Sequence, residues 1–253
     1  MIATAEQPAT LSRIDTRSAP RATGGLSCSN CHLRGACLPR NSPSTFVSDI
    51  SGLIKVRRRV PRGGELYGRG EPFNALYAIH SGSFKSVAVT RVGHKKVTGL
   101  HLPADLVGLE AISGRVHEHE AVALEASEVC VVPYDDLLRL TSWVPELQTH
   151  LLTALSAEIS RDNGLLLRLG SMSADERVAA FVLGLSARYE RLGHTGMLFR
   201  AHLNRMEIAS FLGLSSETVT RVFSRLQHAG LIETKANELR ITNVNGLHTL
   251  SGT

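Results

Sequence analysis

Residues 206–232 read MEIASFLGLSSETVTRVFSRLQHAGLI, and this stretch decides the fold of the C-terminal third of the chain. Two short segments with helical apolar periodicity flank a tight turn at Gly213, which is the pattern of a helix-turn-helix. Ala209 is small where the two helices must approach each other, and Gly213 lets the backbone of the turn bend. The side predicted to be buried carries Ile208, Ala209, Leu212, Leu214, Val219, Val222, Phe223 and Leu226.

The opposite face of the second helix is polar, and we expect it to read DNA. Near its N-terminal end, Arg221 can bond guanine as a fork, Glu217 can accept from cytosine, and the Thr220 methyl can pack on thymine. Phosphate or flanking contacts are predicted for Arg205, Ser216, Arg225 and Lys235. The alternative is a solvated Glu217–Arg221 pair on an ordinary surface helix. The turn, the core spacing and a predicted hairpin wing over 231–241 argue against it.

Upstream of this motif, two helix starts and a long apolar seam are visible. Ser173 with Glu176 and Asn204 with Glu207 have the spacing of N-terminal capping boxes. Before them, apolar residues and one acid repeat every three or four positions, which is a coiled-coil seam. Its members are Leu152, Leu155, Ile159, Asp162, Leu166 and Leu169. We predict a dimerisation helix over 138–170 that makes a homodimer; the alternative is packing against the chain's own β domain.

The segment from Val56 to Pro133 has the sequence pattern of short β-strands rather than of helices. Short alternating stretches such as 76–79 and 83–89 are separated by glycine- and proline-containing turns, which indicates a small antiparallel β sandwich or barrel. The predicted fold class is therefore α+β, with an N-terminal antiparallel β-roll of the cyclic-nucleotide-binding type as sensor, a long helix, and a C-terminal winged helix-turn-helix. The expected domains are 27–137 for the cysteine segment and β-roll, 138–170 for the helix, and 171–253 for DNA binding.

The 253 residues carry a net charge of +5 and are 43% hydrophobic. This is enough for two domains with real cores, and the modest basic excess suits a polyanion partner. Residues 1–26 are rich in Ala, Thr, Ser, Arg and Gly, so we expect a disordered tail. Because neither a secretory pattern nor a transmembrane run is visible, a cytoplasmic location without membrane attachment is expected.

The four cysteines are unevenly placed along the chain. Cys28, Cys31 and Cys37 fall within ten residues, and Cys130 lies at the end of a predicted strand. In a cytosolic chain such a cluster indicates metal binding more readily than disulfides. Three clustered thiolates plus a distant one match the ligand count of a [4Fe–4S] cluster. The alternatives are tetrahedral zinc and, for Cys130 alone, an ordinary buried side chain.

The order of β domain, long helix and winged helix-turn-helix resembles the family of cyclic AMP receptor-like regulators. The motifs that carry the resemblance are LYAIHSGSFK (76–85), LPADLVGLEAI (102–112), ERVAAFVLGLS (176–186) and LGLSSETVTRVFSRL (212–226). The cysteines, with Ser-x-Val-Cys-x-x-Pro around Cys130, resemble the fumarate-and-nitrate-reduction regulator (FNR) branch. The resemblance implies that Cys28, Cys31, Cys37 and Cys130 hold an oxygen-labile cluster. It also implies that the cluster-bearing dimer binds palindromic TTGAT-type sites. There it would activate or repress genes of anaerobic or low-oxygen metabolism.

The effector and partners also follow from this resemblance. The stretches 104–110 and 118–123 lack the phosphate-binding arginine of the cyclic-nucleotide-binding members, so no cyclic nucleotide is expected. RNA polymerase is an implied partner, although the loop 91–96 is basic where the enteric relative has acids. A thiol–disulfide or zinc-controlled DNA-binding regulator using the same cysteines is the second hypothesis. An enzyme is not expected, because no nucleophile–base pair or phosphate-cradling loop is present.

Overall fold

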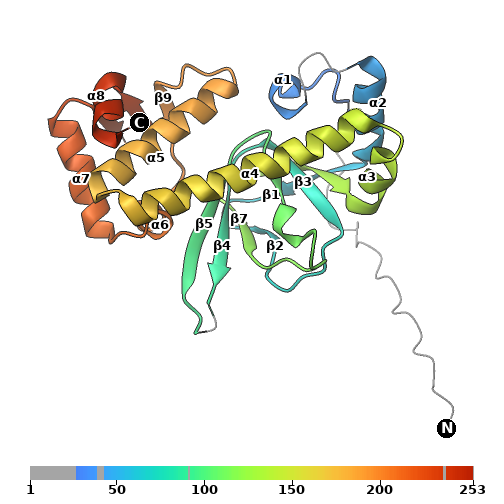
Figure 1. Cartoon of the computed structure of the whole chain (residues 1–253), viewed down its shortest axis with the longest axis horizontal. Helices are drawn as coiled ribbons and strands as arrows, with labels where there is room; N and C mark the ends of the chain where they lie inside the picture. Colours follow the sequence, from blue (N-terminus) through green and yellow to red (C-terminus); the bar gives the residue numbers. More distant parts are fainter. Residues whose placement is uncertain (1–26, 39–42, 91, 236–237, 253) are drawn as a thin grey trace, which may run out of the picture.

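A computed structural model describes residues 27–38, 43–90, 92–235 and 238–252, so the tail expected over 1–26 lies outside the described residues. A β-rich domain, a long helix and a second helical domain follow one another along the chain (Figure 1). This arrangement confirms the predicted fold class. Among the described residues, no helix is long and apolar enough to cross a bilayer.

The β-roll consists of two four-stranded sheets with the orders β1-β8-β3-β6 and β2-β7-β4-β5. Every strand pair within them is antiparallel. Apolar residues at alternate positions face inward, and Leu66, Phe84 and Val129 are almost fully buried between the sheets. The strands are β1 (Val56–Val60), β2 (Glu65–Tyr67), β3 (Ala75–Ser81), β4 (Phe84–Val89), β5 (Lys95–His101), β6 (Leu106–Val107), β7 (Glu120–Ala123) and β8 (Ser127–Pro133).

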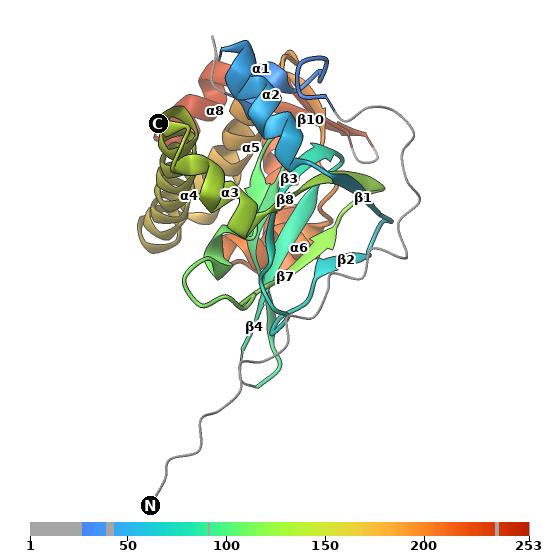
Figure 2. The same cartoon turned by 90° about the vertical axis from the view of Figure 1, so that its right-hand side faces the viewer.

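Three short helices cover one end of this roll. Helix α1 (Arg34–Cys37) belongs to the cysteine segment, α2 (Ser44–Leu53) follows it, and α3 (Tyr134–Thr141) leaves the last strand (Figure 2). The apolar face of α2, with Phe46, Val47 and Ile50, packs into the same core cluster as Cys130. The cysteine segment is therefore attached to the β-roll through a shared apolar core.

The segment expected as one helix over 138–170 is divided. Helix α3 ends at Thr141, and α4 (Pro145–Ser171) begins at a proline in its first turn, where the missing N–H costs no helical hydrogen bond. Helix α4 then runs along the whole β-roll towards the C-terminal domain (Figure 1). Leu147 is its only fully buried residue, although the helix has 27 residues.

The C-terminal domain begins at the two predicted capping boxes, which are both present. Ser173 and Glu176 cap α5 (Ala174–Arg191), and Asn204 and Glu207 cap α6 (Arg205–Leu212). Gly213 ends α6 with a left-handed φ of 64°, and α7 (Ser216–His228) follows. The predicted wing is present as the antiparallel strands β10 (Ile232–Lys235) and β11 (Glu238–Ile241). The structure adds a third wing strand, β9 (Leu198–Arg200), and a last helix, α8 (Val244–Ser251), that packs on α5.

Candidate metal centre and nucleic-acid interface

The four cysteines converge on one cavity of about 90 Å³ at the α2 end of the β-roll. Cys28 is held by a hydrogen bond of 3.0 Å from its N–H to the hydroxyl of Ser51 on α2. Cys31 starts a tight turn into α1, since its carbonyl accepts from the N–H of Arg34, and Cys37 closes that helical turn on Leu33. Cys130 reaches the cavity from β8, where it lies between Arg57 of β1 and Ala78 of β3.

The electrostatics of this cavity disfavour four bare thiolates. Burial raises the pKa of Cys37 to about 12, with further increases from Cys130, Cys28 and Cys31. Burial also raises the pKa of Cys130, while the neighbouring Arg57 guanidinium acts in the opposite direction. The neighbouring cysteines therefore add to the cost of ionising Cys37 and Cys130. A bound cation reverses this relation, because metal binding displaces the thiol protons and compensates the charge.

Residues that the sequence did not single out complete the cavity. Arg57 of β1, His80 of β3 and His150 of α4 line it together with the cysteines. Burial lowers the pKa of His150, which also hydrogen-bonds to the backbone of Cys37. Because these residues lie far from 28–37 in the chain, only the strand register and the path of α4 bring them to the site.

The donor set fits an iron–sulfur cluster or zinc. Thiolates are soft ligands that favour zinc and iron–sulfur clusters over hard cations. The thiols face one apolar cavity from two sides, a loop and a strand, as the expected 3+1 spacing requires. A [4Fe–4S] cluster held by Cys28, Cys31, Cys37 and Cys130 would bring an iron centre whose state responds to oxidants.

The predicted DNA-reading residues lie together on α7. Glu217, Thr220 and Arg221 are all exposed, and α7 lies on the outer side of the C-terminal domain (Figure 1). The Thr220 hydroxyl donates to the carbonyl of Ser216, and Arg221 lies 3.3 Å from the Thr218 hydroxyl. Within the described chain, Arg221 forms no ion pair with Glu217, so the two side chains are available separately.

Two other arginines expected at the DNA are engaged inside the domain. Arg225 makes a bidentate bond to Asp175 of α5, with distances of 2.7 Å to both carboxylate oxygens. The guanidinium of Arg205 lies over the ring of Phe223, 3.6 Å from its centroid. Burial lowers the pKa of Arg205. DNA contacts by Arg205 and Arg225 stay a prediction, and the structure adds that each side chain has an intramolecular partner that the linear spacing does not reveal.

The seam of α4 is exposed in part. Leu152, Ile159 and Leu166, one heptad apart, are 58%, 60% and 67% exposed. Asp162 lies between the last two and is also exposed. Leu155 instead packs against the core of the β-roll, and Leu169 lies next to Gly213 at the turn of the helix-turn-helix. The dimerisation surface that we expect is thus narrower than the six residues of the pattern.

A second cavity, of about 250 Å³, lies between the β-roll and α4. Its lining includes three acids, Glu110, Glu158 and Asp162, and two histidines, His101 and His119. Neither arginine nor lysine is among the described residues that line it. An anionic ligand in this cavity would meet like charges on several sides.

Two domain families match the chain. A Crp-like helix-turn-helix domain covers residues 176–250, and a cyclic nucleotide-binding domain covers residues 57–142. The chain is 38% identical to the transcriptional regulatory protein btr of Bordetella pertussis, over 93% of this chain and 98% of that protein. It is 36% identical to the transcriptional activator protein anr of Pseudomonas aeruginosa, over 94% and 96% of the two chains.

A further relative is the fumarate and nitrate reduction regulatory protein of Salmonella typhimurium, which is 34% identical over 90% of this chain and 91% of its own. The structure of FixK2 from Bradyrhizobium japonicum superimposes with a TM-score of 0.72 at 27% identity and covers 78% of this chain and 98% of that one. A CRP-family regulator from Thermus thermophilus, 22% identical with a TM-score of 0.63, shows the same fold.

A cyclic-nucleotide-binding-type β-roll, joined by a long helix to a winged helix-turn-helix, defines a DNA-binding transcription regulator. The chain belongs to the CRP/FNR family of these regulators, among the relatives of the FNR and Anr proteins. Regulators of this family bind DNA and dimerise, and they are not enzymes, which agrees with the sequence-based expectation.

Proposed function

We propose that this protein is an oxygen-responsive transcription regulator whose four cysteines hold a [4Fe–4S] cluster. In this proposal the cluster-bearing form dimerises and binds palindromic TTGAT-type sites in the cytoplasm, activating or repressing genes of anaerobic or low-oxygen metabolism. The observation that carries the proposal is the convergence of Cys28, Cys31, Cys37 and Cys130 on one apolar cavity. The similarity to a fumarate and nitrate reduction regulatory protein and to the activator anr points in the same direction.

A physical route from cluster to dimer is available along α4. Leu147 and His150 of α4 line the cysteine cavity, and His150 bonds to the Cys37 backbone. Ile159 lies nine residues further on, about 14 Å along a helix. Loss of the cluster would release the segment that holds this end of α4 in place. A small shift of α4 would be enough to change dimer stability, because the Asp162 carboxylates of the two subunits repel each other and weaken the dimer seam.

DNA binding would use α7. The exposed Glu217, Thr220 and Arg221 supply base contacts, and Ser216 at the start of the helix supplies a phosphate contact. A dimer would present two such helices to two half-sites, which fits a palindromic target. RNA polymerase is the partner through which activation would occur. A cyclic nucleotide is not part of the proposal, since the cavity beside α4 presents acids where a phosphate would need a cation.

The decisive experiment is purification without oxygen, followed by assays of iron, acid-labile sulfide, absorbance and DNA binding. We expect a brown protein that holds about four iron and four sulfide atoms per chain, dimerises, and loses DNA binding as air bleaches it. Cys37→Ser should abolish cluster formation. The matched control is Ser51→Ala, which removes the hydroxyl that accepts from the Cys28 N–H and donates to the Val47 carbonyl, and leaves all four ligands.

A colourless protein containing one zinc, or a protein that binds DNA equally well with and without its iron, would refute the cluster proposal. The first result would favour a zinc-controlled regulator. DNA binding that follows the reversible formation of a disulfide would favour thiol–disulfide control.

A further inference from the structure

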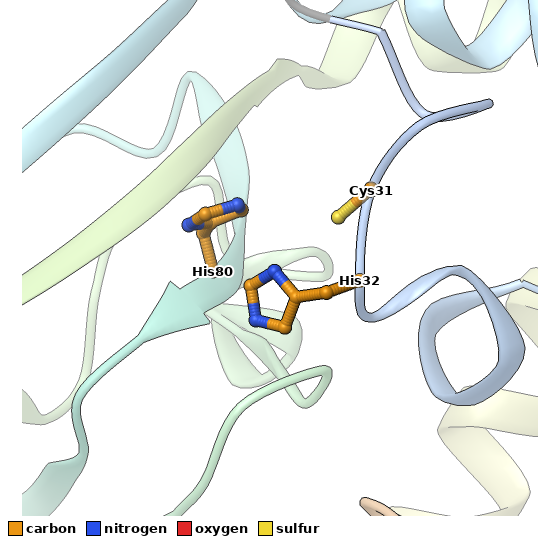
Figure 3. A group of neighbouring side chains, drawn as sticks. All are labelled: Cys31, His32 and His80. Atoms are coloured by element: carbon orange, nitrogen blue, oxygen red, sulfur yellow. The ribbon is translucent and has the colours of Figure 1, made fainter.

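A second group of metal-ligating side chains lies at the rim of the cysteine cavity. Cys31 and His32 come from the turn before α1, and His80 comes from β3 of the β-roll. One ligand atom from each residue lies within 4.8 Å of the other two. Figure 3 shows the two imidazole rings and the thiol gathered around a common space between the loop and the strand.

The two histidines are held beside each other across this gap. Their rings meet edge to face, with centroids 5.1 Å apart and an interplanar angle of 86°. His80 Nδ1 is buried, lies 3.3 Å from a carboxylate oxygen of Glu128, and makes no aligned hydrogen bond. Metal-binding histidines commonly donate their second ring N–H to a carboxylate, and Glu128 lies close enough to His80 to accept that bond if Nε2 holds the ion.

The donor chemistry selects a class of ion. One thiolate with two neutral imidazoles suits zinc and neighbouring divalent transition metals, and it suits calcium or magnesium poorly. Metal–ligand distances of about 2.0–2.3 Å require the donor atoms to move somewhat closer together than they are here. His32 is exposed on a short turn, so its ring can make this adjustment. Three protein ligands leave the fourth position for water.

We propose that Cys31, His32 and His80 form a mononuclear site for Zn²⁺ or a similar divalent transition ion. Cys31 is also one of the four proposed cluster ligands, so the ion and the cluster cannot be bound together. Zinc would thus occupy the cluster-free protein and tie the loop of Cys31 to β3. The mutual exclusion of ion and cluster rests on the proposed function. The existence of the three-ligand site does not.

The test titrates cluster-free, reduced full-length protein with Co²⁺ in the absence of oxygen and follows its visible spectrum. We expect one Co²⁺ per chain with a charge-transfer band of single-thiolate intensity. His32→Ala and His80→Ala should each weaken binding at least about tenfold, because each removes a ligand. His94→Ala, a change at an exposed histidine of the β4–β5 hairpin, should leave binding unchanged. Cys37→Ser should also retain the site.

Two results would overturn the proposal. If both histidine variants bind Co²⁺ like the parent and Cys37→Ser does not, the four cysteines take the ion and the three-ligand site does not exist. If the brown, cluster-loaded protein binds Co²⁺ as tightly as the cluster-free protein, the mutual exclusion is wrong. A protein that never holds a cluster refutes the proposed function, but its Co²⁺ titration still tests the three-ligand site independently.

Discussion

Arg57 lies directly opposite Cys130 in the antiparallel pairing of β1 with β8. The charge of its guanidinium favours the Cys130 thiolate and opposes the effect of burial on the pKa of that thiol. Arg57 is itself held near Glu128, at 3.9 Å. Arg57 thus places a permanent positive charge at the strand side of the cysteine cavity, and Arg34 of α1 lines the cavity from the loop side.

Removal of this charge should slow the reaction of Cys130 with an alkylating reagent. In cluster-free Arg57→Leu the pKa of Cys130 rises, so less thiolate is present at a given pH above neutrality. We expect iodoacetamide labelling of Cys130, located by mass spectrometry, to fall about threefold to tenfold, which corresponds to roughly half a pKa unit to one unit. Arg57→Lys keeps the charge and should react nearly like the parent. Equal labelling rates in the parent, Arg57→Leu and Arg57→Lys would show that Arg57 does not stabilise the Cys130 thiolate.

Asp162→Ala should produce a dimer without the cluster. Asp162 lies between Ile159 and Leu166 on the exposed seam, so two copies would face each other across a two-fold axis. Removal of this repulsion should strengthen the cluster-free dimer by about 1–4 kcal/mol. Sedimentation velocity in air measures the change, with DNA binding as a second readout. A variant that stays monomeric without its cluster would show that Asp162 does not limit dimerisation.

The same residue predicts a pH dependence of the dimer. Burial and Glu158 raise the pKa of Asp162, against the opposing effects of Arg161, His101 and His119. Because a raised pKa favours the protonated carboxyl, dimer stability should be largest at low pH and be lost as the pH rises through that pKa. We expect tighter association of the cluster-free protein at about pH 5 than at about pH 8. Asp162→Asn should remove this dependence, and an unchanged pH profile would count against it.

Arg221 and Arg225 should behave differently although they are one turn apart on α7. Arg221→Ala should cost about 1–3 kcal/mol of binding to a specific site, because the freely exposed guanidinium can reach a base edge. Arg225→Ala removes the ion pair with Asp175 and should lower the free energy of unfolding by only about 0.2–1 kcal/mol. Fluorescence anisotropy with specific and scrambled duplexes, together with thermal unfolding, separates the two effects. The reverse pattern would place the DNA contact at Arg225.

Gly213→Ala should destabilise the DNA-binding domain. Gly213 has a left-handed φ of 64°, and an added Cβ would lie 3.2 Å from a methyl group of Leu169. The backbone conformation alone costs about 1–2 kcal/mol for an L-residue. Gly170→Ala, at a helical position with open space around it, should instead stabilise by up to about 1 kcal/mol. Thermal unfolding of both variants tests the contrast, and equal effects would show that the turn imposes no special conformation.

The local patterns of the sequence predicted much of this fold. The capping boxes at Ser173 and Asn204 and the turn at Gly213 are present as expected. These features depend on residues three or four positions apart, whose interactions form within a single helical turn. The break between α3 and α4 also has a local signal, Pro145, which the seam pattern obscured. Strand β9 and helix α8 escaped prediction, since each depends on how the segment packs against distant parts of the chain.

The sequence by itself determined the class of regulator, the four cysteines with their 3+1 spacing, and the polar face of α7. Only the tertiary structure decided which side chains surround those cysteines and which arginine of α7 pairs with an acid. Strand register brings Arg57 and His80 to the cavity, and helix packing joins Arg225 to Asp175. The physical reason is that these contacts join residues tens of positions apart, where packing of whole elements rather than local backbone preference sets the neighbours.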